Sequence, residues 1–402
     1  MNDRVPALLS LRASELTAPG QQNRLESPIL PEGVTDEEVV ARWLRAKATG
    51  RGRLSPATLA QYRTEAERLF WYARKIAAPI SAWTMDEFSG YIAFLQAPAP
   101  WAIRKAGARR GTDDWRPFLK GLSDRSAGQT QKIVTSLFDW LRNVGYLRLN
   151  PATGLPTVGR TEQEKQSRFL SPVDTALIRE AIADRPESSR EARLAKARDL
   201  FAVDLFERTG LRTTEAVRCQ MGHIRMEPVP AEVRRDYPDT PPFQWLLRVE
   251  RGKGGKARWV PCAEIALSLQ AYRMAYGLPP VPRPDETLPL LLSLRRTRFG
   301  QWKGLRSRTA VWNLVKGLCE ETLTYARAHR HRVDAKRFEA ASTHWLRHSY
   351  AKGLAKAVAN GLDARDALEN MGHVDLRTFG QYLDDEPIKR AVATAQARRN
   401  AR

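Results

Sequence analysis

The sequence contains few of the features that mark secreted or membrane proteins. Three of its 402 residues are cysteines, Cys219, Cys262 and Cys319, too few and too scattered for a disulfide framework. No apolar run reaches the roughly 18 residues that a membrane span requires, and residues 1–31 contain no apolar segment followed by a cleavage site. We therefore expect a protein of a reducing, cytoplasmic compartment with no membrane partner.

Acidic residues are also scarce relative to basic ones. The chain has 66 Lys and Arg against 45 Asp and Glu, which gives a formal net charge of +21. A surface of this charge attracts polyanions, so DNA or RNA is the first candidate partner, with a merely soluble basic protein as the alternative. Because 42% of the residues are hydrophobic, a chain of this length can form two or three domains with real cores.

Patterns for metal and nucleotide binding are incomplete. Cys219 and His223 have helical i, i+4 spacing, but no second Cys/His pair lies nearby. His344 and His348 have the spacing of a zinc pair, yet a tryptophan stands where a zincin helix carries its general-base glutamate. The glycine-rich run 252–256 lacks the Ser or Thr that follows Gly-Lys in a phosphate-binding Walker loop. The sequence therefore predicts neither a metal nor a nucleotide cofactor.

Helical periodicity dominates the first 150 residues. Residues 1–34 show no period and predict a loose tail, and a helical region begins near Thr35. Ser55-Pro56 is typical of a helix start, with a capping serine and proline at the first helical position. A second apolar stripe predicts a helix from Ala127 to Val144.

The stretch between these helices, residues 101–125, is rich in basic side chains. Such a loop can touch the phosphates of a DNA backbone, and a solvated charged surface explains the same composition equally well. The cations that we predict to contact DNA here are Arg104, Lys105, Arg109 and Arg110.

The second half of the chain predicts another mostly helical domain. Residues 151–170 are polar and rich in Gly and Pro, as in a linker, and Ser171-Pro172 then begins a helix. Periodic apolar residues predict a further helix over residues 307–330. Residues 245–249 and 257–260 are β-prone and flank a glycine-rich turn, which predicts a hairpin. Because this is the one clear strand signal, we expect a mainly α fold with a small β-hairpin or sheet (α+β).

Two short motifs in this second domain present groups suited to phosphate chemistry. Arg212 follows Gly210 at a turn that enters a helix, where its guanidinium can offer two hydrogen bonds to a phosphate while Glu215, one turn on, braces it. His344 and Arg347 are also three residues apart and share one helix face. Taken alone, each pair fits an ordinary surface contact.

The predicted hairpin and the C-terminal region add further candidates. Lys253 lies at the glycine-rich tip, where a lysine can reach into a DNA groove, and Lys256 and Arg258 are predicted to contact DNA. His373 follows a glycine, and Tyr382 lies nine residues later. A phenol with a pKa near 10 is a poor nucleophile, so neighbouring guanidinium groups must favour its deprotonation.

In this order the motifs resemble the tyrosine recombinase (phage integrase) family, over roughly residues 35–395. The resemblance implies a helical core-binding domain that clamps DNA at residues 35–150, a linker at 151–170 and a catalytic domain at 171–402. Two segments, 225–243 and 283–340, look longer than the family pattern. The implied catalytic set is Arg212, Lys253, His344, Arg347, His373 and the nucleophile Tyr382, with Glu215 in support.

The resemblance also implies an activity. Such a protein is a site-specific recombinase or integrase of a mobile element, which cuts and rejoins double-stranded DNA through a 3′-phosphotyrosyl link without metal or ATP. It assembles from monomers or dimers into a homotetramer on two duplexes, and it is cytoplasmic and associated with the nucleoid when bound to DNA. The alternatives are DNA relaxation of the type IB topoisomerase kind, a non-catalytic DNA-binding protein of the same fold, and a zinc-dependent nuclease.

Overall fold

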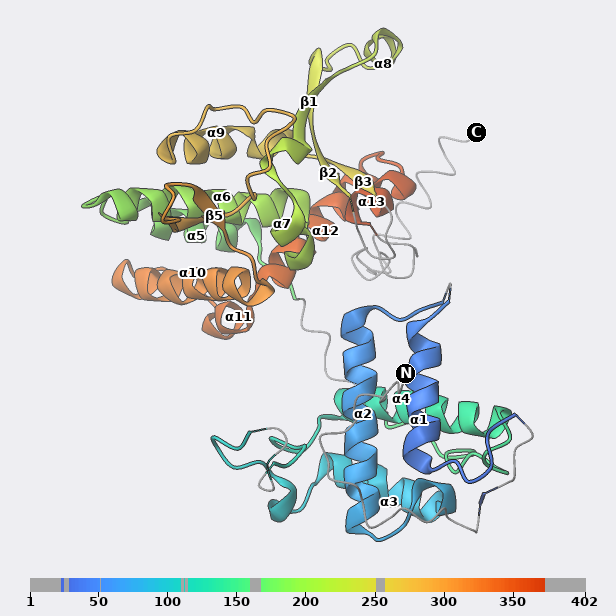
Figure 1. The fold of residues 1–402 in the computed structure, drawn as a ribbon. Helices are drawn as coiled ribbons and strands as arrows, with labels where there is room; N and C mark the ends of the chain where they lie inside the picture. The colour runs from blue at the N-terminus through green and yellow to red at the C-terminus, as the bar shows by residue number, and fades with distance from the viewer. Residues whose placement is uncertain are drawn as a thin grey trace, which may run out of the picture. The chain divides into compact units, whose positions relative to one another are not determined.

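A computed structural model describes most of the chain: residues 23–24, 29–50, 52–109, 112, 115–159, 168–250 and 257–372. The chain divides into two compact units, Met1–Gln166 and Ser167–Arg402, each treated separately below (Figure 1). Five of the predicted site residues lie outside the described residues. They are Arg110, Lys253, Lys256, His373 and Tyr382.

The described part of the first unit is helical. Thr35 caps the first helix in a capping box with Glu38, and the Ser55 hydroxyl accepts a hydrogen bond from the Thr58 amide at the start of the second, as the sequence predicts. The elements are α1 (Asp36–Ala48), α2 (Pro56–Lys75), α3 (Met85–Gln96) and α4 (Asp124–Asn143), with 3-10 turns at Ile80–Ala82 and Pro100–Ala102.

An aromatic core and one buried carboxylate hold this unit together. Trp83, Tyr91 and Phe138 are fully buried and pack ring against ring. Asp36, at the start of α1, is 8% exposed and accepts hydrogen bonds from the Tyr146 hydroxyl and the Ser81 amide. Because a buried carboxylate is costly unless it is hydrogen-bonded, these contacts fix α1 against two distant segments.

Part of the predicted linker folds with the first unit. The Gln131 side chain of α4 donates to the Pro156 carbonyl at 3.0 Å and accepts from the Val158 amide at 2.7 Å. Asn150 is buried and its amide nitrogen donates to Asp139 at 2.8 Å. Residues 151–159 are thus packed against α4, and the division between the two units falls after them.

The second unit combines helices with two small antiparallel sheets, so the mainly α prediction is confirmed. The predicted hairpin is present as β2 and β3, which pair with Val249 opposite Arg258. The helices are α5 (Pro172–Ala183), α6 (Arg190–Thr209), α7 (Thr213–Arg218), α8 (Ala231–Asp236), α9 (Ala266–Ala275), α10 (Arg308–Ala328), α11 (Ala335–Ala340), α12 (Thr343–Ala359) and α13 (Ala364–Met371). The strands are β1 (Ile224–Pro228), β2 (Phe243–Val249), β3 (Arg258–Pro261), β4 (Leu292–Arg296) and β5 (Trp302–Gly304).

Strands β1, β4 and β5 and the short helix α8 are among the elements that the sequence did not predict. β1 pairs with β2, with Ile224 opposite Leu247, and α8 stands at the end of this ribbon, away from the helices (Figure 1). β4 and β5 form a separate sheet. These elements occupy the two segments that look long for the family, and each strand has three to five residues, too few for a periodic signal.

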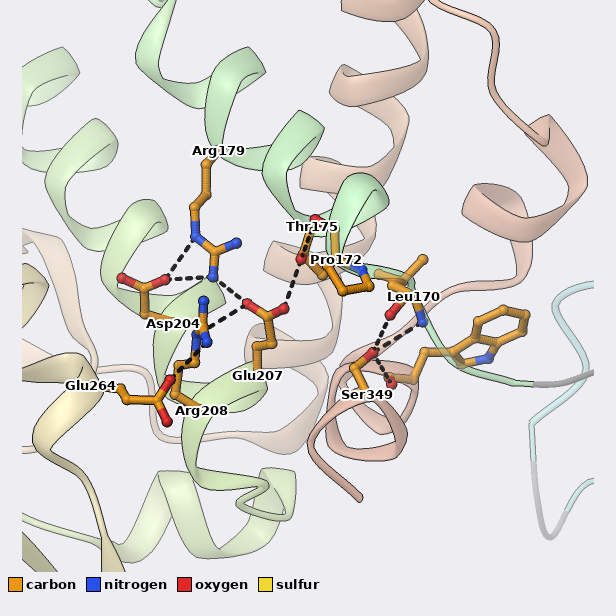
Figure 2. A network of polar contacts seen from close by, with 10 residues as sticks. Leu170, Pro172, Thr175, Arg179, Asp204, Glu207, Arg208, Glu264 and Ser349 are labelled. Atoms are coloured by element: carbon orange, nitrogen blue, oxygen red, sulfur yellow. Dashed lines mark hydrogen bonds and ion pairs between the residues drawn. The ribbon is translucent and has the colours of Figure 1, made fainter. Parts of the chain in front are cut away.

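Polar contacts fix the helices that carry the candidate site. Arg179 of α5 binds Asp204 and Glu207 of α6, with 2.8 Å between the Arg179 Nε and Asp204 Oδ1 (Figure 2). The Ser349 hydroxyl of α12 donates to the Leu170 carbonyl at 2.7 Å and accepts from its amide at 3.0 Å. The start of the unit is therefore tied to α12, and α6 is tied to α5. No helix in the described part of the chain is long and apolar enough to cross a membrane.

Candidate active site

The junction between α6 and α7 presents the first predicted arginine. Gly210 ends α6 with φ +58°, and a Cβ at this position would lie 2.2 Å from the Tyr350 ring, so a larger residue does not fit. Arg212 caps α7, and its amide donates to Glu215 Oε2 at 2.9 Å. The predicted turn into a helix is confirmed, and it leaves the Arg212 side chain about a quarter exposed, at 24%.

Glu215 is a buried carboxylate shared by two arginines. Its side chain is 3% exposed, and Arg212 Nη1 donates to Oε1 at 2.9 Å. Arg258 pairs with both oxygens at once, Nη1 with Oε1 and Nη2 with Oε2, each at 2.9 Å. Burial alone would raise the pKa of Glu215, but the hydrogen bonds and charge of Arg258, together with Arg212, lower it to about 2. Glu215 is therefore ionised at neutral pH and holds both guanidinium groups.

Arg258 does not lie where a DNA contact was expected. Its side chain is 6% exposed, and the guanidinium binds Glu215 rather than facing solvent. The geometry of β3 explains this position. Residues two apart in a strand share a face, so Arg258 lies on the same side as Val260, and both are buried. The sequence prediction is corrected accordingly: Arg258 is an internal partner of Glu215.

His344 and Arg347 share one face of α12, as their spacing predicts. Arg347 is 2% exposed, and its two Nη atoms donate to the Gly210 and Met371 carbonyls. His344 is more exposed, and partial burial with the positive charges of Arg347 and Arg212 lowers its pKa from the usual value. The imidazole is therefore neutral at pH 7 and can accept a proton.

The end of α13 brings the three arginines together. The last carbonyls of a helix have no partner within the helix and attract positive charge. Here three successive carbonyls each accept from a different arginine: Asn370 from Arg258 Nε at 3.3 Å, Met371 from Arg347, and Gly372 from Arg212 Nη2 at 3.1 Å. The chain immediately before His373 is thus held against the arginine cluster.

Three of the remaining predicted residues lie in the described part of the first unit. In the first unit, Arg104 donates to the Arg116 carbonyl at 2.8 Å and stacks over the Trp115 ring, so it supports its own loop. Lys105 and Arg109 are exposed, and their contact with DNA stays a prediction.

Within the described ranges no group of three or more His, Cys, Asp or Glu is placed to hold a metal ion.

Sequence reasoning missed two features of this site. One is the role of Arg258. Its spacing of two residues from the apolar Val260 in β3 was a signal that both side chains lie on the buried face. The other is the use of backbone carbonyls at Asn370, Met371 and Gly372 as arginine acceptors, which no side-chain pattern announces.

Two known proteins illustrate the similarity in sequence. A tyrosine recombinase XerC of Chromobacterium violaceum is 28% identical over 288 residues, which cover 70% of this chain and 78% of that protein. A tyrosine recombinase XerD of Listeria innocua is 24% identical over 263 residues, which cover 65% of this chain and 72% of that protein.

Solved structures share the fold at lower identity. The XerH site-specific recombinase bound to a palindromic difH substrate has a TM-score of 0.55 and 16% identity, covering 85% of this chain and 80% of that one. The Tn1549 transposon integrase in complex with circular intermediate DNA has a TM-score of 0.56 and 16% identity, covering 89% and 97%. A sequence model of the phage integrase family matches residues 180–387, just over half of the 402 residues. The chain therefore belongs to the phage integrase family, the tyrosine recombinases.

Proposed function

We propose that this protein is a site-specific DNA recombinase that cuts and rejoins double-stranded DNA through a 3′-phosphotyrosyl intermediate, without metal or ATP. The observation that carries the proposal is the convergence of Arg212, Arg347 and His344 from two separate helices. Two guanidinium groups can bind the non-bridging oxygens of one phosphate and stabilise the charge that develops on it. The net charge of +21 and the DNA-bound XerH and Tn1549 complexes support DNA as the partner.

The proposed reaction is an in-line displacement at phosphorus. The Tyr382 oxygen forms a bond to phosphorus while the bond from phosphorus to the 5′ oxygen breaks. Lys253 gives a proton to the departing 5′ oxygen, and His373 donates a hydrogen bond to the phosphate. A 5′ hydroxyl from another strand then reverses the step, so the energy of the broken bond is kept in the covalent link.

His344 is the proposed acceptor of the tyrosyl proton. Its pKa is lowered, so the ring is neutral at pH 7 and has a free lone pair for a proton. A protonated imidazole beside two arginines would instead add a third positive charge to the site. General-base help of this kind contributes roughly a hundredfold or more to a reaction rate.

Tyr350 of α12 lies close enough to Arg258 and Arg347 for their charges to act on it, and it is a poor candidate nucleophile. Burial raises its pKa to about 12, with the charge of Glu264 adding to the effect. Its ring packs against the Gly210 backbone. These contacts support Tyr350 as a packing residue and favour Tyr382 as the nucleophile.

Covalent capture tests the proposal directly. A pool of nicked duplexes with randomised sequence is incubated with the protein in the presence of a metal chelator, and detergent-stable protein–DNA adducts are recovered. The wild-type protein should form adducts on a restricted set of sequences, and Tyr382→Phe should bind DNA but form none. An adduct with Tyr382→Phe would show that another residue is the nucleophile.

The same material separates the alternative activities. Two recovered duplexes should be joined crosswise by the wild-type protein, with a protein tetramer in the complex. Relaxation of supercoiled plasmid of any sequence without such joining would favour the topoisomerase alternative. A wild-type protein that binds DNA but yields no adduct would favour the non-catalytic alternative.

A further inference from the structure

Arg258 has several polar contacts inside the candidate site, although it is not one of the predicted catalytic residues. Its two Nη atoms occupy both oxygens of Glu215, and its Nε donates to the Asn370 carbonyl at the end of α13. A Cβ on Gly372 would come within 2.9 Å of the Arg258 guanidinium, so this group also fills the space beneath the last turn of α13. From the start of β3, the strand that follows Lys253, one side chain thus contacts both α7 and α13.

The position of Arg258 determines how Arg212 binds Glu215. Arg258 takes both carboxylate oxygens, and the Arg212 side chain makes one hydrogen bond to Glu215, from Nη1 to Oε1, beside the one from Nη2 to the Gly372 carbonyl. A guanidinium has five N–H donors, and within the described ranges two of those on Arg212 have an acceptor, which leaves the larger part for other acceptors. Without Arg258, the ionised Glu215 would draw Arg212 into the same two-oxygen geometry and turn its donors away from a phosphate.

We infer that Arg258 is a positioning residue for DNA cleavage, and this inference rests on the proposed function. It acts through Glu215, by holding Arg212 at the angle needed for a phosphate, and through α13, by fixing the carbonyl end from which the chain continues to His373. We assign Arg258 no direct role toward the phosphate or the nucleophile. Its substitution therefore slows the chemical step and leaves DNA affinity nearly unchanged.

The chain contains a matched control for this substitution. Arg273 is 1% exposed, pairs with both oxygens of Glu286 at 2.8 and 2.9 Å, and donates through Nε to the Pro279 carbonyl at 2.7 Å. This pair has the same chemistry as the pair of Arg258 with Glu215 and a similarly buried arginine, and in the described part of the chain it contacts none of the predicted catalytic residues. Arg273→Met therefore measures the effect of losing a buried arginine on folding alone.

The experiment compares Arg258→Met, Arg258→Lys and Arg273→Met on a nicked duplex recovered by covalent capture. Thermal unfolding gives the folded fraction, titration gives the Kd, and single-turnover cleavage at saturating DNA gives the rate per folded molecule. Arg258→Met should cleave roughly a hundredfold more slowly, the size of effect that a small misplacement of a catalytic group produces. Its Kd should stay within about threefold of wild type, because no phosphate contact is lost.

Arg258→Lys keeps the charge but cannot bind both oxygens in a fork, so it should recover part of the rate. This variant also keeps the test valid should Arg258→Met fail to fold. Arg273→Met should lower the unfolding temperature and leave the rate per folded molecule unchanged. Equal cleavage rates per folded molecule for wild type and both Arg258 variants would overturn the inference. So would a loss of affinity without a loss of rate, since that pattern belongs to a direct DNA contact.

A sulfur substitution identifies the group through which Arg258 acts. In a duplex with sulfur in place of the scissile 5′ bridging oxygen, the leaving thiol has a pKa near 8.5 and needs no proton donor. This substrate should restore cleavage by Lys253→Ala but not by Arg258→Met. Restoration in both would show that Arg258 supports the lysine instead of Arg212, and the inference would fall. Failure of the wild-type protein to form any adduct would reject the proposed function, a result distinct from each of these.

Discussion

Two buried arginine–glutamate pairs in the second unit have nearly the same geometry and different surroundings. Arg258 and Arg273 each bind both oxygens of a glutamate at 2.8–2.9 Å and donate through Nε to a backbone carbonyl. In each case a backbone amide three residues before the glutamate donates to it as well, from Arg212 to Glu215 and from Arg283 to Glu286. Each glutamate is therefore bound in the same way, by a buried guanidinium and by the backbone amide three residues before it.

The two pairs differ in what else the glutamate holds. Glu215 also binds the side chain of Arg212, which is 24% exposed, whereas Glu286 has one guanidinium partner within the part of the chain that the structure describes. A buried ion pair is weak support for stability by itself, since desolvation offsets much of the attraction. The pair at Arg273 therefore joins two segments only, while the pair at Arg258 also holds a third side chain, Arg212, which we propose binds the scissile phosphate.

The largest effect on cleavage should come from Arg212, the side chain that binds Glu215 in addition to Arg258. Arg212→Ala removes a phosphate ligand and should lower single-turnover cleavage by roughly a hundred- to a thousandfold. Because Glu215 keeps its two bonds to Arg258, the loss of unfolding free energy should be smaller than the roughly 3–5 kcal/mol that a buried charge costs when it loses its partner. Unfolding of the variant by denaturant, measured beside its cleavage rate, checks both parts. Unimpaired cleavage would remove Arg212 from the site.

Neutralising the two glutamates should give similar losses of stability and unequal losses of activity. Glu215→Gln and Glu286→Gln each leave a buried arginine without its counter-charge, a change that costs about 3–5 kcal/mol. Only Glu215→Gln should also slow cleavage, because Arg212 loses its brace. Comparable cleavage per folded molecule in the two variants would contradict the distinction drawn between the pairs.

The pH dependence of the Glu215 contribution follows from its pKa. The folded-state pKa of about 2 lies below the unfolded value of 4.5, so the stability it provides is fully present above pH 4.5 and is lost as the pH falls toward 2. The difference corresponds to about 3 kcal/mol. The gap in unfolding free energy between wild type and Glu215→Gln should therefore narrow between pH 4.5 and 2, as denaturant titrations at several pH values would reveal.

The smallest effect should come from two glycines, Gly372 beside Arg258 and Gly277 just after α9, the helix that carries Arg273. Gly372 has φ +59° and lies against Arg258, whereas Gly277 has φ +71° with no atom within 4 Å of an added Cβ. Alanine at either position should cost about 1 kcal/mol of stability for the left-handed backbone. Gly372→Ala should also displace Arg258 and slow cleavage by about tenfold or less. Thermal unfolding and cleavage rates of both variants check this, and slowed cleavage by Gly277→Ala would contradict it.

Local signals allowed much of the fold to be predicted. Ser55-Pro56 and Ser171-Pro172 each begin a helix because a hydroxyl cap and an N-terminal proline act within a few residues. The β2–β3 hairpin followed from its glycine-rich turn. β1, β4 and β5 escaped prediction because strands this short depend on distant partners rather than on their own pattern.

The candidate site was predictable only where its residues share a helix. His344 with Arg347 and Arg212 with Glu215 are three residues apart, and helical geometry places them together. The partnership of Arg258 with Glu215 spans 43 positions, so it depends on how β3 packs against α7. Hydrogen bonds to backbone carbonyls leave no trace in side-chain identity, which is why the role of the α13 terminus had no sequence signal.

The three arginine contacts at the end of α13 also restrict the length of that helix. Successive residues of an α-helix are rotated by about 100°, so adding or deleting one residue within α13 would turn all three carbonyls to new directions at once. The turn before it, which joins α12 to Asp363, carries no such contacts to the arginines among the described residues. Insertions in related chains should therefore accumulate before Asp363 and be excluded between Ala364 and Gly372.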